Sequence, residues 1–67
     1  MKATIGVSIT DTKKEYEGDI GVVEDVVTSN NGKTHVLVKW DNGSEHGDGA
    51  YGKYTPETFD SRFELNE

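Results

Sequence analysis

The stretch from Val36 to Ser44 constrains the fold more than any other part of the chain. It begins Val36-Leu37-Val38-Lys39-Trp40, in which apolar β-formers recur at every second position, as in a half-buried strand. The strand runs into Asn42-Gly43, a pair that readily adopts the positive φ angles of a type I′ turn. The pattern predicts the first arm of a β-hairpin, closed by a two-residue turn that fixes the register around Trp40.

Similar short runs predict the other strands of a β domain. Ile5, Val7 and Ile9 alternate with polar residues or glycine and predict a strand over 3–10, followed by a surface loop over 11–18. A second strand over 19–27 has doubled valines, which break the alternation and predict a bulge or bend near Gly21. A strand over 34–40 would place Trp40 on the same face as the neighbouring valines.

The last third of the chain has weaker strand signals. Residues 45–52 contain three glycines and predict a long flexible hairpin arm or loop. Thr55-Pro56 combines an N-cap with proline at the first helical position, which predicts a short 3₁₀ or α turn over 55–60. Residues 63–65 alternate apolar and acidic, and predict a closing strand against the N-terminal one.

The length and composition favour one small soluble domain over residues 1–67. At 67 residues without cysteine, the core is thin and has no disulfide to reinforce it, so stability has to come from sheet packing or a partner subunit. Thirteen acidic and seven basic residues give a net charge of −6, which argues against direct binding to nucleic acid. No long apolar run suggests a membrane span or secretory signal, so a cytoplasmic location is expected.

Two segments resemble a known group of domains. Gly18-Asp19-Ile20-Gly21-Val22-Val23 and the later Trp40-Asp41-Asn42-Gly43 are similar to the paired strands of SH3-like barrels of the KOW, Tudor and Mind bomb type. The resemblance covers residues 18–43 and implies an all-β, five-stranded antiparallel barrel with a short 3₁₀ turn before the last strand. It implies an interaction module rather than an enzyme, whose ligands meet the loops and aromatic residues at one rim.

The expected function is that of a non-enzymatic module binding a partner protein with a basic surface, without cofactors. A phage-type inhibitor of a host nucleic-acid-binding protein is a special case of this hypothesis. Tudor-type domains hold methylated side chains in an aromatic cage, for which Tyr16, Tyr51 and Tyr54 are candidates, although core packing is favoured for them. The predicted partner-binding residues are acidic or aromatic: Glu15, Tyr16, Glu17, Glu45, Asp48 and Tyr51.

Two other hypotheses stay open at this stage. The first is an oligomeric protein that binds an anionic ligand such as a nucleotide with its glycine-rich loop 46–52 and Lys53. The second is a structural barrel within a larger assembly. Sharper chemistries have little support, because His35 and His46 lack cysteine or spaced carboxylate co-ligands, and the glycines at 47, 49 and 52 do not follow a long buried strand.

Overall fold

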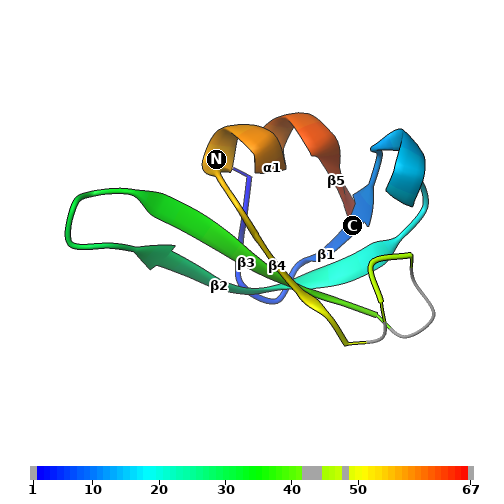
Figure 1. Ribbon diagram of the computed structural model, residues 1–67, viewed down its shortest axis with the longest axis horizontal. Helices are drawn as coiled ribbons and strands as arrows, with labels where there is room; N and C mark the ends of the chain where they lie inside the picture. Colours follow the sequence, from blue (N-terminus) through cyan, green and yellow to red (C-terminus); the bar gives the residue numbers. More distant parts are fainter. Residues whose placement is uncertain (1, 42–44, 48, 67) are drawn as a thin grey trace.

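Five antiparallel strands form one curved sheet in the computed structural model, which describes residues 2–41, 45–47 and 49–66 (Figure 1). Their spatial order is β4-β3-β2-β1-β5, so that β4 and β5 lie at the two edges. The sheet is not closed into a barrel, because the described residues show no pairing between these edges. The strands are β1 (Ser8–Asp11), β2 (Ile20–Thr28), β3 (Thr34–Trp40), β4 (Tyr51–Tyr54) and β5 (Phe63–Asn66).

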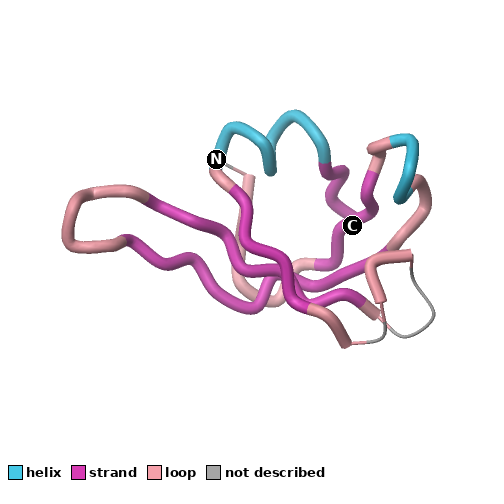
Figure 2. Tube along the Cα trace, viewed as in Figure 1, coloured by secondary structure: helices cyan, strands magenta, loops and turns pink. Residues whose placement is uncertain are grey.

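Two short helical segments complete the fold, which is therefore mostly β rather than all-β. A 3₁₀ segment, η1 (Lys14–Tyr16), lies between β1 and β2, and α1 (Pro56–Arg62) lies between β4 and β5 (Figure 2). The hydroxyl of Thr55 caps α1 by accepting a hydrogen bond from the Thr58 amide. The predicted helix start is confirmed, and of the two forms predicted for 55–60 the α form is observed. The 3₁₀ turn implied by the resemblance is wrong, and the helix extends over seven residues because Phe59 continues it by packing into the core.

The N-terminal strand is shorter than the predicted range of 3–10. Gly6 has a φ of 90°, and the Val7 amide donates to the Thr4 carbonyl, so the chain turns before β1 begins at Ser8. The predicted closing strand is confirmed, since β5 pairs antiparallel with β1 and places Leu65 opposite Ile9.

The irregularity predicted in the second strand occurs at Glu24, not at Gly21. The register of β2 against β3 passes from Val23↔Val38 to Asp25↔Leu37, which leaves Glu24 as an extra residue. This bulge lets Val26, three residues after Val23, also pack against the core.

Gly21 instead makes room for side chains of the neighbouring strand β3. A Cβ atom there would lie 2.8 Å from Cε3 of Trp40 and 2.9 Å from Cγ1 of Val38. The absence of a side chain therefore allows the indole to lie directly over β2.

The predicted two-residue hairpin does not join β3 to β4. In the observed register Lys39 pairs with Tyr51, and the Trp40 amide donates to the Ala50 carbonyl at 2.8 Å. A two-residue loop at 42–43 would instead pair Asp41 with Ser44. The predicted register around Trp40 is therefore wrong, while the Asn42-Gly43 turn itself lies outside the described residues.

The core is small and combines four aliphatic with three aromatic side chains. Trp40 packs with the valines of its own face as predicted, and the rings of Phe59 and Phe63 cover them. Among the described residues, no helix is long and apolar enough to cross a membrane. The fully or nearly fully buried hydrophobic residues are Ile9, Val23, Val36, Val38, Trp40, Phe59 and Phe63.

Candidate functional site

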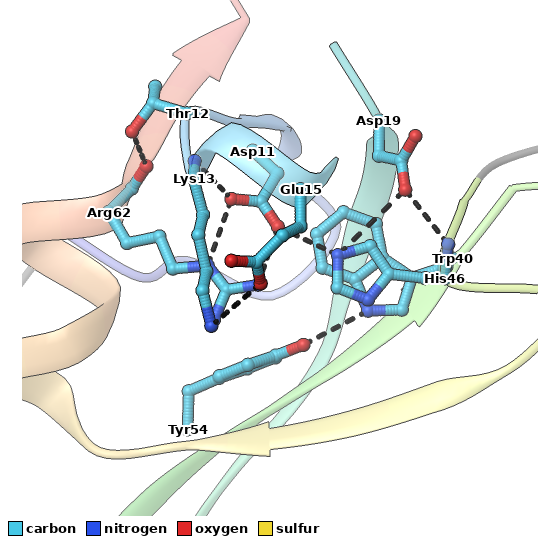
Figure 3. A network of polar contacts seen from close by, with 9 residues as sticks. All are labelled: Asp11, Thr12, Lys13, Glu15, Asp19, Trp40, His46, Tyr54 and Arg62. Atoms are coloured by element: carbon cyan, nitrogen blue, oxygen red, sulfur yellow. Dashed lines mark hydrogen bonds and ion pairs between the residues drawn. The ribbon is translucent and has the colours of Figure 1, made fainter. Parts of the chain in front are cut away.

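A buried carboxylate at the end of β1 organises the most densely bonded region of the protein (Figure 3). Asp11 has no exposed surface, and its Oδ1 accepts hydrogen bonds from Arg62 Nε and the Lys13 amide, both at 2.9 Å. Its Oδ2 lies 2.7 Å from both Arg62 Nη2 and His46 Nε2. The carboxylate thus connects three segments that are far apart in the sequence.

These contacts decide the ionisation of Asp11 and the tautomer of His46. Burial on its own would raise the pKa of Asp11, but hydrogen bonds from Arg62, Lys13 and His46 outweigh it and hold the pKa below the ordinary value of 3.8. The pKa of Arg62 is raised, chiefly by its hydrogen bond to Asp11. Because an ionised carboxylate only accepts hydrogen bonds, Nε2 of His46 carries the proton and donates it.

His46 lies between two aromatic rings and fastens the segment 45–47 to the sheet. Its ring stacks on Trp40 with centroids 3.7 Å apart and on Tyr16 with centroids 4.0 Å apart. Its backbone amide donates to the carboxylate of Asp19, at 2.9 Å. Only 10% of its side chain is exposed, so both ends of the residue are held in one position.

Three aromatic rings surround the guanidinium of Arg62. The rings of Tyr16, Tyr54 and Phe63 have their centroids 5.1–5.4 Å from its central carbon. This distance is typical of cation–π contact. Trp40 Nε1 donates to the hydroxyl of Tyr54 at 3.2 Å, and burial raises the pKa of that phenol. The rings therefore hold a cation that belongs to the chain itself.

The polar and aromatic groups of this region mostly contact one another and fix connecting segments to the sheet. Asp11 and His46 resemble part of a catalytic dyad, but Asp11 already has four polar contacts and rings cover both faces of the imidazole. Within the described ranges, no group of three or more side chains could hold a metal ion.

The structure brings four of the predicted binding residues onto adjoining segments. Glu15 and Tyr16 belong to η1 and Glu17 follows it, while Glu45 precedes His46 in the neighbouring segment. The Tyr16–His46 stack joins the two segments, and all three glutamates are exposed. Exposed Asp41 directly follows β3, and its amide donates to the carbonyl of Ile20, next to Asp19. We refer to these four residues and Asp41 as the acidic rim.

The other two predicted binding residues do not belong to the acidic rim. Asp48 lies outside the described residues. Tyr51 is 59% exposed and lies opposite Lys39, whose ammonium is 5.9 Å from its ring. Residues directly opposite in a sheet share a face, so Tyr51 is on the face opposite to buried Trp40. The three tyrosines considered as a cage are therefore not assembled around one site.

The residues that hold the site together were not predicted from the sequence. Asp11 and Arg62 are 51 positions apart, and neither stands in a recognisable motif. One signal was available, because Asp11 follows Ile9 by two positions and so shares its inward face. A carboxylate on an inward face needs a cationic or hydrogen-bonding partner.

Comparisons with protein family models, with curated proteins and with solved structures find no match to this chain.

Proposed function

We propose that this protein is a small, non-enzymatic interaction module that binds a basic segment of a partner protein at its acidic rim. The observation that carries the proposal is the rigid attachment of η1 and segment 45–47 to each other through His46. Exposed carboxylates on rigid segments lose little conformational freedom when a partner binds. The rim is therefore organised before a ligand arrives.

Charge supports a basic partner. Glu17, Glu45 and Asp41 have no ion pair among the described residues, and Glu15 has only an exposed contact to Lys13 at 3.5 Å. These carboxylates are available to lysine or arginine of another protein. The chain's net charge of −6 would also steer a basic partner towards it.

The fold supports the resemblance to SH3-like interaction domains. A five-stranded antiparallel sheet with a short helix before the last strand agrees with the arrangement that the resemblance implies. The open sheet departs from a closed barrel. We propose a relationship at the level of architecture, and architecture by itself does not assign a ligand.

The internal bonding of the Asp11 network supports a non-enzymatic role. Arg62 and His46 both point at the buried carboxylate, and the aromatic rings that could have received an external cation surround Arg62. The proposal therefore assigns these residues, with the Tyr16 ring stacked on His46, to positioning the rim, and it assigns binding to the exposed carboxylates.

A matched pair of triple variants tests the proposal. In the rim variant Glu15, Glu17 and Glu45 are replaced by Gln, and in the control variant Glu24, Glu57 and Glu64 are replaced by Gln. Both sets are exposed and both change the net charge from −6 to −3, since three negative charges are removed. The probe is a fluorescent oligo-arginine peptide, and the readout is anisotropy at low and high salt.

We expect the rim variant to bind the peptide at least about threefold more weakly than the control, since exposed ion pairs contribute about 0.2–1 kcal/mol each. Binding should also weaken as salt rises. Equal losses in both variants would mean that only net charge matters, and the proposed site would then be wrong. Capture of partners from native lysate with the same three proteins would identify the physiological ligand.

A further inference from the structure

Among the described residues, the edge strand β4 presents a row of backbone hydrogen-bonding groups without a partner strand. The Trp40–Ala50 hydrogen bond shows that this pair is hydrogen-bonded in the antiparallel ladder. Because hydrogen-bonded and non-bonded pairs alternate, Gly52 and Tyr54 also direct their amides and carbonyls at β3. The amides and carbonyls of Tyr51 and Lys53 consequently point away from the sheet, and they have no hydrogen-bond partner in the part of the chain that the structure describes.

The side chains along this edge would complement those of a second copy related by a two-fold rotation. Tyr51 and Lys53 are both exposed and lie on the same face, on either side of Gly52. A two-fold axis at Gly52 would place Tyr51 opposite Lys53 of the second copy, and Lys53 opposite the other Tyr51. Both pairs would be of the hydrogen-bonded kind, with a lysine beside a tyrosine ring.

Gly52 suits the centre of such an interface. The Gly52–Gly52 pair would be a non-bonded pair, in which the two backbones approach most closely, at about 4.5 Å between Cα atoms. A larger residue would be obstructed within its own chain as well, since a Cβ atom at position 52 would lie 2.7 Å from Cε2 of Tyr54. The bare backbone therefore leaves the edge open at its midpoint.

We propose that two copies of this protein associate through antiparallel pairing of their β4 strands, which extends the five-stranded sheet across a two-fold axis. The contact supplies four backbone hydrogen bonds and two Tyr51–Lys53 pairs. It is independent of the acidic rim and of the function proposed for it.

The shortness of β4 and the presence of a lysine are features that usually discourage pairing at a sheet edge. They limit the strength of this association without preventing it, because the two-fold register sets each Lys53 against a tyrosine rather than against another lysine. Two copies that each carry a charge of −6 repel one another. The Lys53 side chains that the two β4 strands bring to the interface repel one another as well. Added salt screens both repulsions, so the association should strengthen as salt rises.

Sedimentation velocity over a range of protein concentrations, at low and high salt, measures the association. The diagnostic variant is Lys53→Pro, which removes the outward amide and leaves the β3–β4 ladder intact. Its control, Lys53→Ala, removes the side chain alone. We expect Lys53→Pro to raise the dimer dissociation constant roughly tenfold or more relative to the control, because two of the four hydrogen bonds are lost.

A side-chain exchange tests the register independently and does not depend on how proline is accommodated. Tyr51→Lys sets lysine against Lys53 of the second copy and should weaken the dimer, whereas Tyr51→Lys combined with Lys53→Tyr should restore it. A wild-type protein that stays monomeric at all concentrations and salts overturns the proposal. A dimer that responds neither to Lys53→Pro nor to the exchange forms through another surface, and equally overturns it.

Discussion

Replacing Arg62 by Gln should strongly destabilise the fold, because it leaves the Asp11 carboxylate buried without its cation. Removing one partner of a buried ion pair costs about 3–5 kcal/mol. Two other hydrogen bonds to Asp11, from Lys13 and His46, survive the change, so we expect the lower part of that range. A domain of this length has a free energy of unfolding of roughly 3–10 kcal/mol. The loss is therefore a large fraction of the total stability.

Urea denaturation followed by fluorescence measures the effect, since Trp40 is the single tryptophan and its ring belongs to the same network. The double variant Asp11→Asn, Arg62→Gln provides the control. We expect it to be less destabilised than the sum of the two single variants by about 0.5–3 kcal/mol, because the orphaned charge is gone. The reasoning is refuted if each single variant lowers the free energy of unfolding by less than about 1 kcal/mol and the double variant shows the sum of the two losses.

The pH dependence supplies a second check on the same prediction. The pKa of Asp11 in the folded protein is below the ordinary value of 3.8. The stabilisation from its ionised form is thus complete above that value and is lost as the pH falls through the lower, folded pKa. In Arg62→Gln, the guanidinium no longer offsets the effect of burial, which raises the pKa of Asp11. The stability difference between wild type and variant should consequently shrink below about pH 4, and a constant difference would contradict this account.

Three further variants test the core around Trp40. Trp40→Ala should cost about 3–5 kcal/mol in urea denaturation, since the residue is 1% exposed, and a folded variant of nearly unchanged stability would contradict its place in the core. Gly21→Ala should cost about 1–3 kcal/mol, because the new methyl group meets Trp40 and Val38, and a neutral result would mean that β2 and β3 can separate freely. Tyr54→Phe should cost about 1–3 kcal/mol through the unpaired indole N–H. In ultraviolet titration of the wild type, one phenol should ionise above pH 10, and this step should be missing from Tyr54→Phe.

The β-strands were predictable where the local pattern and the tertiary environment agree. Val36, Val38 and Trp40 alternate in the sequence and are buried in the structure, and Thr55-Pro56 begins a helix as its chemistry indicates. In both places short-range preference and burial favour the same conformation.

The hairpin register was not predictable, because the strong turn preference of Asn42-Gly43 competed with the weaker strand preference of a segment further along the chain. Asn42-Gly43 favours a two-residue turn, yet β3 pairs with Tyr51–Tyr54, which contains a glycine and a lysine and has little strand character. That register places Tyr54 next to the buried Val36 and lets its hydroxyl accept from Trp40. Packing of the aromatic core thus outweighs turn propensity.

The candidate site was predictable only at its surface. Glutamates in polar segments are expected to be exposed, and Glu15, Glu17 and Glu45 are. The bonds that bring their segments together depend on Asp11, His46 and Arg62. These three residues come from a strand end, a connecting segment and a helix C-terminus, and no periodic pattern relates such positions.

The extra residue at Glu24 has a consequence for how this chain could change in length during evolution. With Glu24 deleted, Val23, Asp25 and Val26 would still face Val38, Leu37 and Val36 in an unbroken ladder, and both inward valines would keep their side. Loss of one codon from the middle of β3 would instead turn either Val36 or Trp40 out of the core. Loss of a single codon should therefore be tolerated at Glu24 in β2 and removed by selection when it falls in the middle of β3.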